Sequence, residues 1–143
     1  MLKILKAIKK PVLIGEVSCN HNGKLQNAKK IIDTAVRYGV DLVKFQTYSA
    51  SSLTIRSNKK DFLIKKGLWK GKKLWDLYKK AQTPFSWQKE LFYYARKRNI
   101  KCFSSPFDEY AVDLLEELDC PIYKLASFEI NHLPLIKRIS ETK

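Results

Sequence analysis

Short apolar runs alternate with amphipathic stretches along this chain of 143 residues. The runs typical of buried parallel strands are 11–17, 41–46, 100–103 and 122–126. The stretches in which the apolar pattern indicates helices are 25–38, 84–98, 108–118 and 134–140. Strands that alternate with helices predict an α/β fold built on a parallel sheet.

The segment 100–127 contains one complete strand–helix–strand unit with the sequence IKCFSSPFDEYAVDLLEELDCPIYKLAS. Its first strand is followed by Ser104 and Ser105, and its second strand is followed by Ser127. Parallel strands end at the same edge of a sheet, so these hydroxyl groups predict a polar rim. In α/β folds that rim is where ligands bind.

Residues 49–83 break this rhythm because they are longer than an ordinary strand-to-helix loop. The segment is too apolar for a linker, so we predict an ordered insertion after the second strand. Its aromatic residues and those just after it favour core or insertion packing over nucleic-acid stacking; they are Trp69, Trp75, Tyr78, Phe85 and Trp87.

Four strand–helix units with this insertion fit the N-terminal half of a (β/α)8 TIM barrel or a small doubly wound sheet. Neither G-x-G-x-x-G nor G-x-x-x-x-G-K-[ST] occurs, which weakens the case for a nucleotide-binding sheet. A complete barrel takes about 250 residues. We therefore expect a partial barrel domain over 1–143.

The formal net charge of +14 is compatible with a nucleic acid, a membrane surface or an anionic small ligand. The lysines, however, are scattered in local pairs such as Lys59–Lys60 and Lys65–Lys66, which is typical of solvated faces. No nucleic-acid motif accompanies them, and no apolar run approaches the roughly 18 residues of a membrane span. We expect neither a nucleic acid nor a membrane as partner.

Cysteine usage and the N-terminus both favour a cytoplasmic protein. Cys19, Cys102 and Cys120 are odd in number and form no C-x-x-C pair, which predicts free thiols rather than a disulfide framework or a zinc site. The first residues, MLKILKAIKK, lack the long apolar core and the cleavage site of a signal peptide.

Charged and hydroxyl side chains lie at the carboxyl ends of the predicted strands: Glu16, Lys44, Ser105, Lys124 and Ser127. A charge inside an apolar strand is costly unless it is paired or bound to a ligand. Two lysines and two hydroxyl groups suit a small, multiply anionic ligand, such as a phosphate ester that also carries a carboxylate. The alternative is that Glu16 pairs with one lysine as a structural bridge.

The chain has two histidines, and a metal pair would require them to converge. His132 lies in a loop after the fourth predicted strand, where a hydrogen-bonded or solvent-facing role is expected. His21 follows Glu16 at the presumed active face, which makes it a candidate for substrate binding. We assign no metal ligand within this chain.

Four stretches resemble motifs of a known family and occur in the order that the family has: IGEVSCNHNGKLQNAKKIIDTA, DLVKFQTY, FSSPFD and YKLASFE. Together they resemble the sialic acid (N-acetylneuraminate) synthase family from about residue 11 to the end. The insertion looks most like that of the pseudaminic acid synthase branch. The resemblance implies a transferase that condenses phosphoenolpyruvate with an acetamido sugar to a nonulosonic acid and releases phosphate.

The resemblance also implies a (β/α)8 barrel followed by an antifreeze-like domain, so that 1–143 would be a fragment without the second half barrel and that domain. A homodimer is expected for the full-length protein. A divalent metal (Mn²⁺, Mg²⁺ or Co²⁺) is expected as well, held by histidines beyond Lys143. A non-catalytic anion-binding half barrel or an interaction module stays open as the alternative.

The family's functional residues carry over to this chain by position. The resemblance gives Glu16 the catalytic role of a strand-one carboxylate in proton or water chemistry. Gln46 and Glu129 match residues near the sugar or metal end of the site. The residues that match the phosphoenolpyruvate-binding set are Lys44, Ser105, Lys124 and Ser127.

Overall fold

The computed structural model describes residues 11–142. Three parallel strands lie in the order β1-β2-β3 and have the bounds β1 (Ile14–Glu16), β2 (Leu42–Thr47) and β3 (Lys101–Pro106). The helices outside the insertion are α2 (Leu25–Arg37), α5 (Phe85–Lys97), α6 (Glu109–Glu117) and α7 (Leu133–Ser140). Within residues 11–142, none of the helices has the length and apolar character needed to cross a bilayer.

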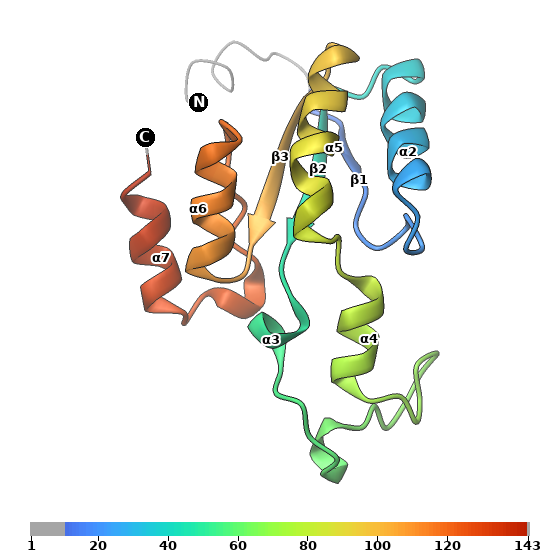
Figure 1. Ribbon diagram of the computed structural model, residues 1–143, viewed down its shortest axis with the longest axis vertical. Coiled ribbons are helices and arrows are strands. Elements are labelled where there is room, and N and C mark those ends of the chain that lie inside the picture. Colours follow the sequence, from blue (N-terminus) through green and yellow to red (C-terminus); the bar gives the residue numbers. More distant parts are fainter. Residues whose placement is uncertain (1–10, 143) are drawn as a thin grey trace.

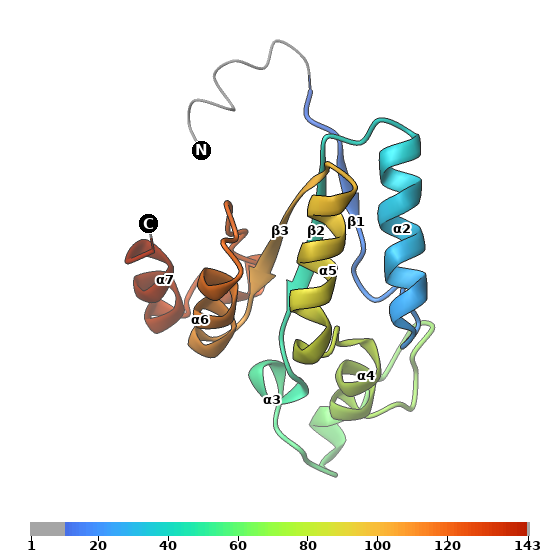
Figure 2. The same ribbon diagram turned by 45° about the horizontal axis from the view of Figure 1, so that its top comes forward.

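The two faces of β2 differ in burial, and the buried face lies against the hydrophobic core. Val43, Phe45 and Thr47 are completely buried and alternate with partly exposed residues on the opposite face. Phe45 packs against Phe92 of α5 with ring centroids 5.7 Å apart, and Ile32 of α2 joins the same cluster. Helices α2 and α5 therefore cover one face of the sheet, as Figures 1 and 2 show.

Local signals in the sequence explain where the helices begin and end. Gly39 has the positive φ of +69° that glycine tolerates best, and it follows Tyr38, the C-cap residue of α2. Asp108 caps α6, because its Oδ1 accepts a hydrogen bond from the Ala111 N–H at 2.7 Å. The four predicted helices are confirmed to within about two residues at each end.

The strand predicted over 122–126 does not form, so the prediction of four strands is wrong for residues 11–142. Tyr123 makes a single parallel bridge to Ser104, and the Lys124 N–H donates to the Ser104 carbonyl at 3.0 Å. Pro121 has no N–H to donate. Pairing with β3 does not continue beyond this bridge, and the chain turns into the 3-10 helix η2 (Ser127–Glu129).

The first predicted strand is also shorter than expected, since β1 covers only three residues. Hydrogen bonds from the Leu42 N–H to the Leu13 carbonyl and from the Val17 N–H to the Lys44 carbonyl nevertheless extend its contact with β2. Parallel strands alternating with helices confirm the predicted α/β class.

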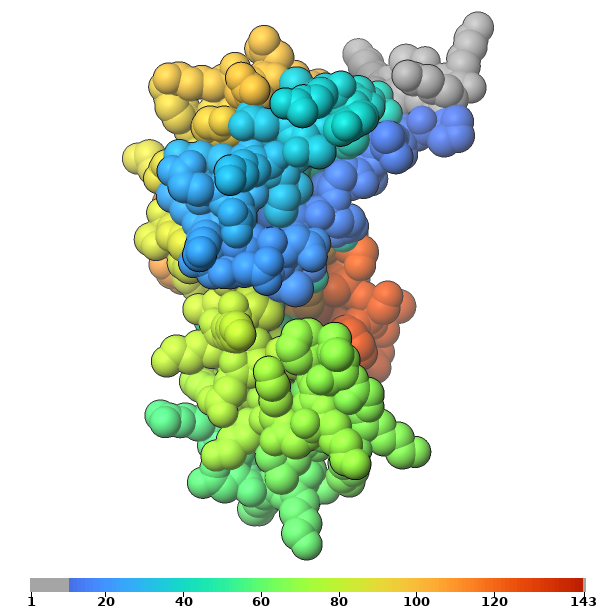
Figure 3. All heavy atoms as spheres, turned by 90° about the vertical axis from the view of Figure 1, so that its right-hand side faces the viewer, coloured from blue at the N-terminus to red at the C-terminus, as the bar shows by residue number. Residues whose placement is uncertain are grey.

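The insertion after β2 is ordered, as predicted. It contains α3 (Ala50–Leu53), the 3-10 helix η1 (Lys60–Phe62) and α4 (Leu74–Ala81). An antiparallel bridge joins Leu63 to Lys73. Figure 1 shows these elements beyond the end of β2, and in the space-filling view of Figure 3 they form the lower part of the molecule.

Candidate functional site

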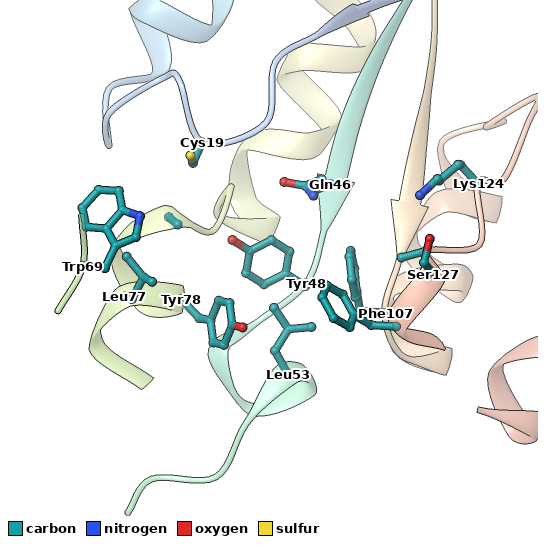
Figure 4. A pocket seen from close by; sticks show the side chains of 13 residues that line it. Cys19, Gln46, Tyr48, Leu53, Trp69, Leu77, Tyr78, Phe107, Lys124 and Ser127 are labelled. Carbon is teal, nitrogen blue, oxygen red and sulfur yellow. The ribbon is translucent and has the colours of Figure 1, made fainter. Parts of the chain in front are cut away.

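A pocket of about 380 Å³ opens where the strands end at their carboxyl termini (Figure 4). Gln46, the penultimate residue of β2, contributes an amide. Lys124 and Ser127 come from the segment after α6 and are both exposed. The pocket therefore combines an ammonium group, a hydroxyl group and an amide, which suits an anionic ligand.

Backbone pairing explains how these polar groups come together. Gln46 is the register partner of Ser105 on β3, so the two side chains share one face of the sheet. Ser18, in the loop after β1, donates its hydroxyl to Gln46 Oε1 at 3.2 Å. Lys124 is attached to β3 through its bond to the Ser104 carbonyl. Ser105 itself is buried and does not line the pocket.

Lys44 and Glu16 form an ion pair with 2.6 Å between Nζ and Oε1. They are register partners on β2 and β1, and only 12% of the Lys44 side chain is exposed against 52% for Glu16. This contact is the structural bridge between Glu16 and a lysine that the sequence allowed as the alternative. Neither residue lines the pocket, and the Glu16 carboxylate holds the Lys44 ammonium group. Of the two lysines that the sequence places at strand ends, Lys124 lines the pocket and Lys44 does not.

His21 is completely buried away from the pocket. Its Nδ1 accepts a hydrogen bond from the Gly23 N–H at 3.1 Å, and its Nε2 lies 3.3 Å from the Thr83 hydroxyl. The ring also meets Trp87 edge-on. Burial lowers the pKa of His21, opposed by a hydrogen bond to the Ala81 carbonyl. This geometry is that of a neutral imidazole that ties the loop after β1 to the segment between α4 and α5.

Glu129 and His132 contact each other rather than the pocket. His132 Nδ1 lies 3.2 Å from Glu129 Oε2, and 13% of the Glu129 side chain is exposed. Across residues 11–142, no group of three or more His, Cys, Asp or Glu side chains is placed to hold a metal ion.

Aromatic residues form the floor of the pocket, and the polar residues at the strand ends did not predict them. Tyr48 directly follows β2 and Phe107 directly follows β3; their ring centroids are 5.4 Å apart. Tyr78 of α4 meets Tyr48 edge-on at 6.4 Å. Burial, with smaller contributions from Cys19 and Tyr78, raises the pKa of Tyr48 to about 12, so its hydroxyl stays protonated. For Tyr48 and Phe107, the position directly after a strand was the available signal.

The sequence predicted that Trp69 packs within the core or the insertion, but its side chain is not buried there. Its indole lines the pocket and is 43% exposed. Cys19, in the loop after β1, lines the pocket as well and is exposed.

Comparison with known proteins identifies the family. A model described as the NeuB family matches residues 31–143. The chain belongs to the NeuB family. It is 45% identical to the pseudaminic acid synthase of Helicobacter pylori over 133 residues, and 44% identical to that of Campylobacter jejuni over 135 residues.

Those alignments cover 93% and 94% of this NeuB-family chain, respectively, but the chain spans only 39% of the length of each relative. A solved structure, the N-acetylneuraminic acid synthetase of Leptospira borgpetersenii in complex with citrate, has 27% identity and a TM-score of 0.75. That match covers 92% of the present chain and 42% of the other. Sequence and fold similarity therefore agree over nearly the whole chain.

Proposed function

We propose that this chain is the phosphoenolpyruvate-binding part of a nonulosonic acid synthase of the pseudaminic acid type. The observation that carries the proposal is the meeting of Lys124, Ser127 and Gln46 in one pocket at the carboxyl ends of the strands. The 45% identity to a pseudaminic acid synthase supports the choice of branch. We also propose that residues 1–143 belong to the N-terminal part of a (β/α)8 barrel domain.

The proposed chemistry joins phosphoenolpyruvate, an acetamido sugar and water into a nonulosonic acid and inorganic phosphate. Carbon 3 of phosphoenolpyruvate forms a bond to the sugar aldehyde, water adds at carbon 2, and the phosphate leaves. The Lys124 ammonium group and the Ser127 hydroxyl would hold the anionic substrate and fix its reacting face. Both side chains are exposed toward the pocket, which makes them accessible to a ligand.

Glu16 and Lys44 would act beside this pocket rather than in its lining. Lys44 lies two residues before Gln46 and on the same face of β2. Its Nζ lies 2.6 Å from Oε1 of Glu16, which holds the carboxylate beside the pocket. Ser105, on the same face as Gln46, would support the bound anion from beneath.

The divalent metal that the resemblance implies does not fit the described residues. Glu129 and His132 are a pair, and residues 11–142 provide no set of three ligands. The residues described here would contribute the binding and orientation of the anion.

The test is direct binding of phosphoenolpyruvate to this chain, measured by titration calorimetry. Lys124→Ala should weaken binding by about tenfold or more, since a hydrogen bond to a charged group is lost. Lys89→Ala removes an exposed lysine of α5 and is the control. Equal affinity in the two variants would refute the role of Lys124. Binding of phosphoenolpyruvate without release of its phosphate in the presence of an acetamido sugar would favour a non-catalytic anion-binding module.

A further inference from the structure

The insertion after β2 forms one whole side of the pocket. Trp69, Leu77 and Tyr78 come from it, and so do Leu53 and Ala81. Figure 4 shows Trp69 and Leu77 on one side and Lys124 and Ser127 on the other, with Tyr48 between them. The pocket therefore has a cationic, hydrogen-bonding end and an apolar end contributed by different parts of the chain.

A closed hairpin holds Trp69 in this position. The Ile64 N–H donates to the Lys72 carbonyl at 3.0 Å, and the Gly71 N–H donates to the Ile64 carbonyl at 2.8 Å. The turn requires the positive φ angles of Gly67 (+78°) and Gly71 (+83°).

A cation–π contact holds the indole further, because Lys72 Nζ lies 5.0 Å from the centre of the Trp69 ring. The Lys72 N–H also donates to the Trp69 carbonyl at 3.0 Å. An aromatic ring fixed in this way can contact a ligand at little further entropic cost.

We propose that the wall formed by Trp69, Leu77 and Tyr78 is a specificity site for the acetamido methyl group of the sugar. The inference rests on the proposed function, in which the cationic end takes phosphoenolpyruvate. The sugar must then lie beside that end, toward the apolar wall. A methyl group gains from burial against aromatic and aliphatic side chains, whereas a hydroxyl group at the same place loses hydrogen bonds to water.

The experiment compares two sugars that bind in the presence of saturating phosphoenolpyruvate: N-acetylmannosamine, and mannose, which has a hydroxyl group in place of the acetamido group. Trp69→Ala should weaken binding of the acetamido sugar by about tenfold and leave mannose almost unchanged. Trp69→Phe should keep most of the preference because it retains an aromatic ring. Leu68→Ala is the matched control, since Leu68 is 87% exposed in the same hairpin and does not line the pocket.

Separate titration of phosphoenolpyruvate distinguishes the two possible failures. If the parent chain does not bind phosphoenolpyruvate, the proposed function fails. If it does bind, three outcomes overturn the specificity site: the parent chain binds no acetamido sugar, Trp69→Ala weakens both sugars equally, or Trp69→Ala changes neither. Tyr78→Leu repeats the test from α4, independently of how the hairpin tolerates substitution.

Discussion

Lys44 and Glu16 are joined across the first two strands, with 2.6 Å between Nζ and Oε1. A second pair, Lys29 of α2 with Glu90 of α5, has almost the same exposure: 18% and 49% of the side chains, against 12% and 52%. The second pair lies on helices that cover the opposite face of the sheet. Within residues 11–142, these two Lys–Glu ion pairs are therefore similar in exposure, and they differ in that the Lys44–Glu16 pair lies beside the pocket.

We predict that Lys44→Gln weakens phosphoenolpyruvate binding and that Lys29→Gln does not. Each substitution leaves a half-exposed carboxylate without its partner, so each should lower the free energy of unfolding by a similar amount of about 1 kcal/mol. Urea unfolding measures that shared cost, and calorimetric titration measures binding. Equal binding losses in both variants would mean that Lys44 has only a structural role.

The buried His21 should make stability depend on pH. Burial lowers its pKa in the folded protein below the usual 6.5, while the unfolded chain keeps the usual value. The unfolded state therefore binds the proton more readily, and the contribution to stability is complete above pH 6.5. It is lost as the pH falls from 6.5 through the lower pKa of the folded state.

His21→Gln should flatten this dependence in urea unfolding experiments between pH 7.5 and pH 5. The substitution should also cost about 2 kcal/mol at pH 7.5, since it removes a buried ring and its hydrogen bonds. His132→Gln is measured in parallel because it removes the chain's other histidine. A slope that survives in His21→Gln would contradict the prediction.

The local periodicity predicted α2 to within one residue of its observed end because helix formation depends on neighbouring residues. It failed for 122–126, because strand formation there depends on backbone hydrogen bonds to β3, such as the one from the Lys124 N–H to the Ser104 carbonyl. It also missed the apolar side of the pocket. Trp69 reaches the site through a hairpin closed by backbone hydrogen bonds between Ile64 and both Gly71 and Lys72, which an apolar pattern does not encode.

Asp108 connects the insertion to α6 through its two carboxylate oxygens. Oδ1 accepts from the Ala111 N–H, and Oδ2 accepts from the Ser52 hydroxyl at 2.5 Å. We predict that Asp108→Ala lowers the free energy of unfolding by about 1–2 kcal/mol, from the lost helix cap and the lost bond to α3. Asp108→Asn, which can still cap the helix, should cost less in the same urea titration. A loss as large for Asn as for Ala would argue against the cap.

The three cysteines should differ sharply in reactivity. Burial raises the pKa of Cys102 to about 12 and that of Cys120 to about 11, and both thiols lie in the core. Cys19 is exposed and lines the pocket. Because the thiolate is the reactive form, one thiol of the folded chain should react with Ellman's reagent at pH 8, roughly a hundredfold faster than the others.

Denaturation should expose all three thiols to Ellman's reagent, and Cys19→Ser should remove the fast phase of the reaction in the folded chain. Cys19 and Lys124 line the same pocket, so saturating phosphoenolpyruvate should slow the fast phase in the parent chain. In Lys124→Ala the same ligand concentration should protect much less, which ties the thiol measurement to the binding site. Protection that persists unchanged in Lys124→Ala would place the anion elsewhere on the molecule.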